Sequence, residues 1–185
     1  MMNLFNRPVA QFKTESGKEI LIFRPTLDRL PILLRFTNRL IAEDTYLNLT
    51  GRAKTYQEEE SWLRGTLADI KSKKSLYFWA VSDGKIVGSV SVNHGYERSW
   101  HVGKIGLMVD RDFRRDGIGT KLLEFILKEA QDFEIKMATL EVFKENFPAI
   151  KLYKKFDFRV YGRLPGGLFR KGKFSDTIEM YKKLD

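Results

Sequence analysis

At the centre of this sequence stands Val109-Asp-Arg-Asp-Phe-Arg-Arg-Asp-Gly-Ile-Gly-Thr-Lys-Leu-Leu123, a loop with two glycines between two apolar segments. The apolar run 105–109 predicts a buried strand that ends where the loop begins. After the loop, apolar residues recur at the spacing of an amphipathic helix. The face of that helix is predicted to contain Leu122, Leu123, Phe125, Ile126 and Ala130.

A glycine loop that leads into a helix N-terminus is suited to a phosphate or a diphosphate. The first backbone N–H groups of a helix have no acceptor within the helix, and this end carries a partial positive charge. Gly117 and Gly119 have no Cβ, so the backbone can approach a ligand closely. Arg114 and Arg115 add charge and planar donors. A Walker loop is excluded by spacing, and Leu122 stands where a dinucleotide fingerprint needs its third glycine.

The composition is that of an ordinary globular chain of 185 residues, and we expect a single domain over residues 1–185. No apolar run approaches the ~20 residues of a membrane helix, and residues 1–18 lack the features of a signal peptide. The chain has no cysteine, which excludes disulfides, thiolate metal sites and a cysteine nucleophile. With two histidines, no metal site is expected. We expect a cytoplasmic protein.

The net charge of +9 has three interpretations. A basic protein can bind nucleic acid, but its lysines and arginines are scattered and accompanied by acidic residues such as 58–60. A basic field also attracts a polyanionic cofactor. Solubility alone accounts for many of the charges. Charge by itself does not choose among these interpretations.

Seven strands and four helices are predicted along the chain, in an order that favours a mixed sheet covered by helices. Residues 1–18 are expected to be polar and irregular, with room for a short edge strand. The predicted strands cover 19–23, 76–82, 85–92, 102–109, 136–143, 158–164 and 175–181. The predicted helices begin near Thr26 or Asp28, after Thr55, after Gly117 and after Asn146. A long connection is expected over 164–174.

Two motifs in this order resemble the GNAT superfamily of N-acetyltransferases. The first is Arg114-x-x-Gly117-x-Gly119, and the second is filled by Asn146, Ala149, Leu152, Tyr153 and Phe158. The resemblance implies an α/β (α+β) fold. Its central sheet would have about six to seven strands, mostly antiparallel with one splayed parallel pair, and about four flanking helices. The sequence departs from the family pattern at Asp157 and Arg115, where glycine is usual, and at Arg111, where proline is frequent.

The resemblance further implies transfer of an acetyl group from acetyl-CoA to an amine acceptor. It assigns coenzyme binding to Leu107, Met108, Val109, Arg114, Arg115, Asp116, Gly117, Ile118, Gly119, Thr120 and Asn146. Tyr153 matches the tyrosine that serves as general acid. Glu141 matches the base of acetyltransferases that act on protein N-termini, and partial burial would make it a better base. A solvent-facing or ion-paired role for Glu141 is the alternative, and His94, His101 or water are other candidate bases.

The acceptor is left open among a peptide or protein N-terminus, an amino acid and a small amine. The resemblance places its site in loops 44–55 and 164–174, with Tyr46, Arg52, Tyr56, Phe169 and Arg170 as candidate lining residues. No membrane is expected as a partner, nucleic acid is not favoured, and a homodimer is left open. The rival interpretation is a module without catalysis that senses acyl-CoA or binds nucleic acid.

Overall fold

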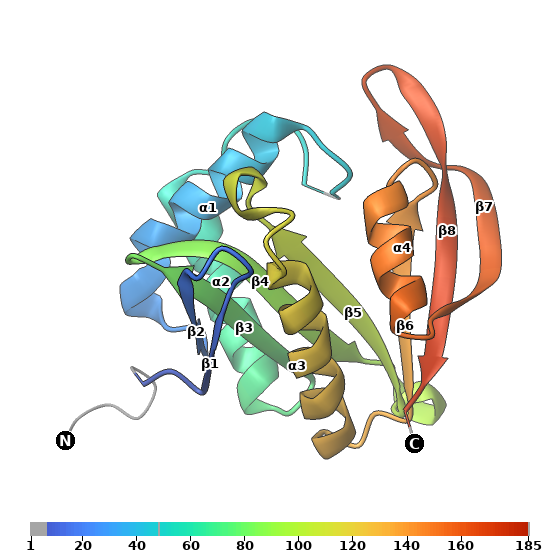
Figure 1. The fold of residues 1–185 in the computed structure, drawn as a ribbon, viewed down its shortest axis with the longest axis horizontal. Coiled ribbons are helices and arrows are strands. Elements are labelled where there is room, and N and C mark those ends of the chain that lie inside the picture. The colour runs from blue at the N-terminus through green and yellow to red at the C-terminus, as the bar shows by residue number, and fades with distance from the viewer. Residues whose placement is uncertain (1–6, 48, 185) are drawn as a thin grey trace. The chain divides into compact units, whose positions relative to one another are not determined.

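The computed structural model describes residues 7–47 and 49–184, and its elements largely follow the predicted order (Figure 1). The strands are β1 (Ala10–Lys13), β2 (Glu19–Phe23), β3 (Ser75–Ser82), β4 (Lys85–His94), β5 (Val102–Val109), β6 (Met137–Phe143), β7 (Arg159–Arg170) and β8 (Lys173–Lys183). The helices are α1 (Leu30–Glu43), α2 (Tyr56–Lys71), α3 (Ile118–Asp132) and α4 (Phe147–Lys155). Short 3-10 helices are η2 (Leu27–Arg29), η3 (Glu97–Ser99) and η4 (Arg111–Phe113).

The strands form a mixed sheet in the order β1-β2-β3-β4-β5-β6-β8-β7. β5 and β6 run parallel, whereas the pairs β1–β2, β2–β3, β3–β4, β6–β8 and β7–β8 run antiparallel. This confirms the predicted fold class. The sheet has eight strands in the described residues rather than six or seven, because β1 pairs with β2 as an edge strand. Residues 1–6 of the segment predicted to be irregular lie outside the described residues.

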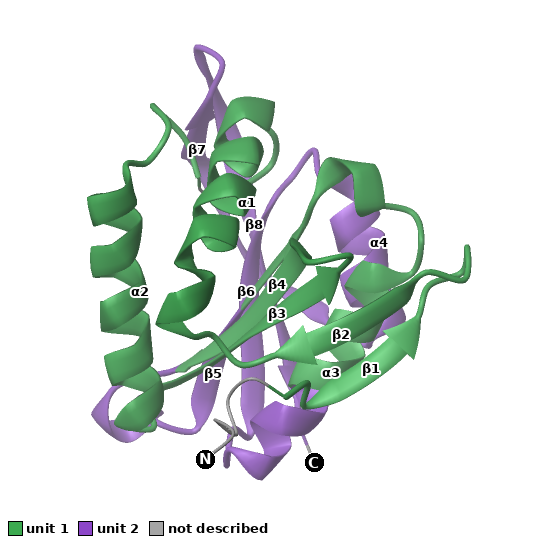
Figure 2. Ribbon diagram, turned by 90° about the vertical axis from the view of Figure 1, so that its left-hand side faces the viewer, with its two compact units in different colours: residues 1–93, 106–126 green, residues 94–105, 127–185 purple. Residues whose placement is uncertain are grey.

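The chain falls into two compact units, which Figure 2 shows in different colours. Unit 1 contains Met1–Asn93 and Gly106–Ile126, and unit 2 contains His94–Ile105 and Leu127–Asp185. The boundaries fall inside β5 and α3, so each of these elements contributes to both units. The prediction of one domain over residues 1–185 stays a prediction.

Unit 1 has helices against both faces of its strands. One cluster of buried side chains joins β2, α1, α2, β3 and β4, and it includes Phe23, Leu33, Phe36, Leu40, Leu63, Trp79 and Ile86. On the other face, the ring of Phe78 lies 4.9 Å from that of Phe125 in α3. Burial on both faces explains why β3 is apolar along most of its length. Each buried apolar side chain contributes about 1.5–3 kcal/mol.

Local signals place the elements of unit 1 where the sequence predicts them. Thr55 and Glu58 form a capping box at the start of α2, the helix predicted to begin after Thr55. Asp83 and Gly84 both have positive φ, 47° and 69°, as a two-residue hairpin turn requires. Trp62 of α2 is 46% exposed, and its ring lies 5.5 Å from that of Tyr77 in an edge-to-face arrangement.

Unit 2 contains the hairpin of β7 and β8, and here the sequence prediction fails. Residues 164–174 are not a long connection, because β7 continues to Arg170 and a two-residue turn joins it to β8. The register shifts between Leu164 and Leu168, which absorbs the Pro-Gly-Gly segment 165–167 as a bulge. At Gly167 a Cβ would lie 2.5 Å from Thr177 Oγ1. Residues 165–167 therefore form a bulge within β7 and do not end the strand.

No helix within residues 7–47 and 49–184 is long and apolar enough to cross a membrane. The same residues contain no group of three or more histidine, aspartate or glutamate side chains arranged to hold a metal ion.

Candidate coenzyme loop and catalytic residues

The loop between β5 and α3 starts at a buried carboxylate. Asp110 is 3% exposed, and its backbone N–H donates to the carbonyl oxygen of Val87 at 2.9 Å. Its side-chain oxygen Oδ1 accepts from the backbone N–H of Asp112 at 3.0 Å, which caps η4. Asp110 therefore ends the strand and turns the chain into the loop.

Two left-handed residues then lead the loop into α3. Arg115 has φ 61° and Gly117 has φ 78°. Glycine adopts this region without strain, which explains why glycine is usual in the family where this chain has Arg115. The carbonyl oxygen of Gly117 accepts the first helical bond, from Lys121 N–H at 3.0 Å. The N–H groups of residues 118–120 are therefore the first amides of α3, which have no acceptor within the helix.

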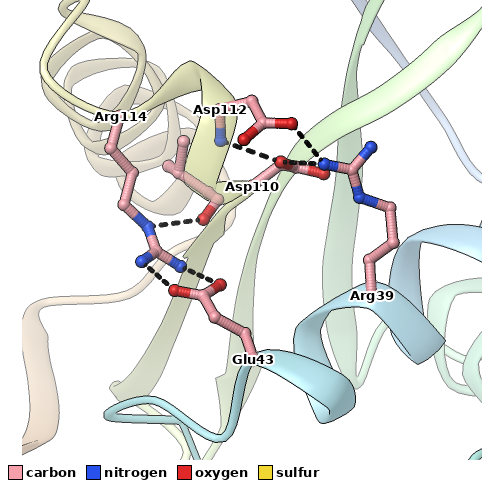
Figure 3. A network of polar contacts seen from close by, with 6 residues as sticks. Arg39, Glu43, Asp110, Asp112 and Arg114 are labelled. Atoms are coloured by element: carbon pink, nitrogen blue, oxygen red, sulfur yellow. Dashed lines mark hydrogen bonds and ion pairs between the residues drawn. The ribbon is translucent and has the colours of Figure 1, made fainter.

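The guanidinium of Arg114 makes hydrogen bonds to other groups of the protein. Its Nε donates to the carbonyl oxygen of Val109 at 3.0 Å, and its two terminal nitrogens donate to the two carboxylate oxygens of Glu43 at the end of α1 (Figure 3). This bidentate pair ties the loop to α1. A direct contact of Arg114 with phosphate stays a prediction.

A second ion-pair network lies beside the first (Figure 3). Arg39 of α1 donates to Asp110 Oδ1 at 3.0 Å and to Asp112 Oδ2 at 2.6 Å. The hydrogen bond to Asp112 and the charge of Asp110 raise the pKa of Arg39. A pocket of about 320 Å³ adjoins this network, lined by Arg39, Leu40, Ala42, Glu43, Asp110, Arg111 and Asp112. The second half of α1 and η4 thus border an open, charged pocket next to the loop.

The turn between β1 and β2 holds the loop from another side. The carboxylate of Asp116 accepts from the backbone N–H of Ser16 at 2.7 Å and from its hydroxyl at 2.6 Å. The hydroxyl bond is the main cause that lowers the pKa of Asp116. Lys18 Nζ lies 5.1 Å from the centre of the Phe113 ring. A Cβ at Gly117 would lie 3.4 Å from Glu15 Oε1.

Unit 1 brings together all but one of the predicted coenzyme residues. Leu107, Met108, Val109, Arg114, Arg115, Asp116, Gly117, Ile118, Gly119 and Thr120 lie at the end of β5, in the loop and in the first turn of α3. The parallel register pairs Val102–Lys104 with Met137–Thr139, and the boundary between the units follows on β5 after Ile105. The splay predicted for the parallel pair of strands stays a prediction.

Asn146, the remaining coenzyme residue, lies in unit 2 at the start of α4. Its Oδ1 accepts from the backbone N–H of Ala149 at 3.3 Å, which confirms the predicted cap. Its contact with a coenzyme stays a prediction. After α4, Asp157 has φ 62°, so aspartate adopts the left-handed conformation at the position where the family usually has glycine.

Tyr153, the predicted acid, is a buried residue of α4. Its side chain is 8% exposed, and its ring centre lies 5.8 Å from that of Phe158. Burial raises the pKa of Tyr153 to about 12, because a phenolate is poorly solvated there. The hydroxyl therefore holds its proton at neutral pH, as a general acid must before it reacts.

Glu141, the predicted base, does not have the partial burial expected of it. Its side chain is 39% exposed, and Oε1 accepts from Lys104 Nζ at 2.7 Å. Leu140 and Val142 are buried, as expected for residues that face the opposite side of β6 from Glu141. The contact with Lys104 therefore agrees with the alternative interpretation, in which Glu141 is an ion-paired residue. A role for Glu141 as base stays a prediction.

The two histidines make structural contacts in unit 2. His94 Nδ1 lies 2.5 Å from the carbonyl oxygen of Trp100, and its ring centre lies 4.4 Å from that of Phe133. The carbonyl oxygen of His101 accepts from the N–H groups of Lys136 and Met137 at 2.8 and 3.1 Å. These contacts fasten the turn before β5 to the start of β6.

The candidate acceptor residues are distributed over both units. In unit 1, Arg52 makes a bidentate pair with Glu58, and Tyr56 at the start of α2 is 47% exposed. Tyr46 is half-buried in the loop after α1. In unit 2, Phe169 is 63% exposed on the hairpin near Arg170, and its ring lies edge-on to Phe174.

Sequence reasoning missed the residues that hold the coenzyme loop in place. Glu43, Arg39 and Ser16 all lie more than 70 residues away from their partners in the chain. Single charged or polar residues at such separations carry no periodic or spacing signal. The one available signal is the high density of acidic and basic residues in 110–116, which indicates that this loop has charged partners.

Comparison with known proteins supports the expectation from the sequence motifs. The sequence profile of the acetyltransferase (GNAT) family matches residues 39–158. The chain is similar to the L-amino acid N-acetyltransferase AaaT of Escherichia coli, with 30% identity over 116 residues that cover 62% of this chain and 70% of AaaT. It is also similar to an N-alpha-acetyltransferase of Sulfolobus acidocaldarius, with 33% identity over 100 residues, 49% of this chain and 60% of that protein.

Solved structures share the fold over most of the chain. A GNAT-family acetyltransferase from Streptococcus pneumoniae matches with a TM-score of 0.80 and 27% identity, covering 90% of this chain and 99% of that one. The yncA protein of Salmonella typhimurium, solved with acetyl-CoA, matches with a TM-score of 0.76 and 15% identity, covering 90% and 94%. The second likeness concerns the fold alone.

Proposed function

Because the chain belongs to the acetyltransferase (GNAT) family, we propose that it transfers an acetyl group from acetyl-CoA to a primary amine. The observation that carries the proposal is the entrance to α3, where left-handed Arg115 and Gly117 bring the chain to the first amides of the helix. Such amides bind a diphosphate through backbone donors and the helix dipole. The hydrogen bonds and ion pairs of Arg114 and Asp116 hold the loop in that shape.

Acetyl-CoA would supply a thioester, whose acyl carbon accepts the amine nitrogen while its sulfur leaves as a thiol. The residues proposed to hold it are the loop 114–120 through its amides, Leu107–Val109 through their backbone and Asn146 through its side-chain amide. The N–H of Val109 would polarise the thioester carbonyl, as an oxyanion-hole donor does.

Proton transfer is assigned to two residues of unit 2. Most primary amines are protonated at neutral pH, so a base must remove a proton before the nitrogen can attack. Glu141 is proposed to take that proton, because its exposed carboxylate can receive an ammonium from solvent. Tyr153 is proposed to protonate the departing sulfur, because its buried hydroxyl retains its proton.

The acceptor is proposed to be an α-amine, carried by an amino acid or by a peptide N-terminus. Support comes from two relatives, one named as an L-amino acid N-acetyltransferase and the other as an N-alpha-acetyltransferase. The basic residues near the tip of the β7–β8 hairpin argue against a polycationic acceptor, since like charges repel. We also propose a cytoplasmic location for the protein. The absence of cysteine in this sequence is compatible with that location.

A thiol-release assay with acetyl-CoA tests the proposal. The acceptor panel should contain L-amino acids, short peptides with free N-termini and a polyamine, and mass spectrometry should identify the acetylated product. We expect turnover with at least one α-amine and none with the same peptide blocked at its N-terminus. Absence of turnover with every acceptor, together with tight and salt-sensitive binding to DNA, would favour a non-catalytic nucleic-acid-binding module instead.

A further inference from the structure

The carboxylate of Glu141 belongs to a small group of side chains in unit 2, which we call the Glu141 cluster: Lys104, Glu141, Tyr161 and Glu179. Lys104 comes from β5, where it pairs with Thr139 of β6. Its ammonium reaches along β6 to Glu141 Oε1 at 2.7 Å. Both side chains are well exposed, 57% for Lys104 and 39% for Glu141. The pair is therefore accessible to solvent and to a charged ligand.

Glu179 adds a second carboxylate to the cluster. It stands directly opposite Glu141 in the antiparallel register of β6 and β8, and such neighbours have Cβ atoms about 4.5–5.5 Å apart. On the other side, Glu179 pairs with Gly162 of β7. A Cβ at Gly162 would lie 2.5 Å from Glu179 Oε2, so the absence of a side chain there makes room for this carboxylate.

Tyr161 borders the two carboxylates. The register of β7 shifts between Val160 and Gly162, so Tyr161 is the extra residue of a bulge. Bulges re-aim side chains and are frequent beside active sites. Burial, followed by the charges of Glu179 and Glu141, raises the pKa of Tyr161. Its phenol therefore lies in the field of both carboxylates and stays uncharged.

The charges of the cluster do not cancel. It contains two carboxylates and one ammonium, which leaves a net charge of −1. The excess negative charge attracts a second ammonium, so the amine of an acceptor can approach Glu141 while Lys104 stays in contact with Oε1.

We propose that Lys104 is a positioning residue for Glu141: its ammonium holds the carboxylate through Oε1 while the ammonium of the acceptor approaches the same carboxylate. This inference rests on the proposed function, in which Glu141 is the base. Once the acceptor ammonium contacts Glu141, its proton passes to the carboxylate and the freed nitrogen is the nucleophile. Glu179 acts only through its charge, which draws the acceptor ammonium toward Glu141.

The test must separate the orientation of the Glu141 carboxylate from the net charge of the cluster. It compares four proteins: the wild type, Lys104→Met, Glu179→Gln and the double variant. The net charges of the cluster are then −1, −2, 0 and −1, counted from the same four side chains. The probe is a C-terminally amidated peptide with one free α-amine and no other charge, at saturating acetyl-CoA. A unit charge about 6 Å away in water changes binding about threefold.

KM for the peptide should fall as the net charge of the Glu141 cluster becomes more negative. We expect it to fall about threefold in Lys104→Met, to rise about threefold in Glu179→Gln and to return to the wild-type value in the double variant. These differences should shrink as salt is added. In contrast, kcat should follow Lys104 and drop about tenfold or more in both variants that lack it. Lys104→Arg, which keeps the cation, should restore most of kcat.

The possible results are distinguishable. If the wild type releases no thiol with any acceptor, the proposed function itself fails. If the wild type is active but Lys104→Met leaves both constants unchanged, the positioning role is overturned. It is also overturned if KM rises and kcat falls together in Lys104→Met and Lys104→Arg alike, because that pattern indicates structural damage. Melting temperatures of all variants show whether each protein is folded.

Discussion

The guanidinium of Arg114 binds the carboxylate of Glu43 through both terminal nitrogens, which joins the loop between β5 and α3 to the end of α1. The same side chain reaches the carbonyl oxygen of Val109 at 3.0 Å. One residue thus connects three parts of unit 1: the end of β5, the loop and α1. Because bidentate charged hydrogen bonds fix geometry as well as contribute energy, this contact presets the position of the loop amides.

A double-mutant cycle on this pair shows how Arg114 acts. We expect Glu43→Ala and Arg114→Ala each to weaken acetyl-CoA binding about tenfold, and the double variant to bind no more weakly than either single variant. Full coupling is expected if Arg114 works by ordering the loop. Isothermal titration calorimetry measures the affinities. Normal binding by Glu43→Ala beside weak binding by Arg114→Ala would instead show direct contact of Arg114 with the phosphates.

The replacement Gly117→Glu should abolish acetyl-CoA binding. Gly117 has φ 78°, and a side chain there would meet Glu15 and bring a negative charge to the helix entrance. We expect the affinity measured by calorimetry to fall more than about hundredfold. Gly172→Glu is the matched control, because Gly172 has φ 76° and open space around it. Equal losses of affinity in the two variants would mean that backbone strain, not the coenzyme loop, is responsible.

Removing the hydroxyl of Tyr153 should affect turnover and leave coenzyme binding intact. In Tyr153→Phe we expect kcat to fall about hundredfold, since general acids contribute at least this much, with acetyl-CoA affinity within about twofold. Full activity in this variant would remove Tyr153 from the mechanism. Calorimetry and the thiol-release assay together separate the two effects.

The raised pKa of Tyr153 also predicts a pH dependence of stability. Its folded-state pKa is about 12 against an ordinary value of 10.0. The folded state therefore holds the proton more tightly, and the stability from this group is complete below about pH 10 and is lost as the pH rises toward about 12. Denaturant titrations in this range should show a smaller alkaline loss for Tyr153→Phe. An equal loss in both proteins would contradict the assignment.

A buried hydrogen bond between α1 and α2 should contribute measurably to stability. Thr37 donates its hydroxyl to Glu59 Oε1 at 2.6 Å, and Glu59 is only 4% exposed. Thr37→Val keeps the shape but leaves the carboxylate without this donor, so we expect unfolding to become easier by about 1–3 kcal/mol. Urea denaturation measures the change. Thr66→Val on the surface of α2 is the control and should cost less than about 0.5 kcal/mol.

Much of the fold could be predicted because its signals are local. The strand 102–109 ends at Val109 as expected, since the apolar run stops there. The capping box at Thr55, the turn at Asp83-Gly84 and the left-handed Asp157 each depend on a few neighbouring residues. The prediction for 164–174 failed because Pro165 and the two glycines after it break regular strands, whereas here the register shift accommodates them.

The candidate site could be predicted only in part, because only some of its features depend on neighbouring residues in the sequence. The motif residues 114–120 lie together because they are consecutive, and their spacing indicates the chemistry. The burial of Tyr153 and the exposure of Glu141 depend on which side of an element meets a neighbour. Glu141 shows the limit: its place in the strand indicates which way it points, but not that Lys104 of another strand pairs with it.

The sequence alone determined the order of elements, the loop between β5 and α3 and the family that they indicate. These depend on short-range periodicity, caps and turns. The tertiary structure decided which charges hold the loop, that β7 continues through its bulge and that Lys104 and Glu179 lie beside Glu141. The physical reason is that such contacts join residues far apart in the chain, and their partners are chosen by packing and register rather than by neighbouring sequence.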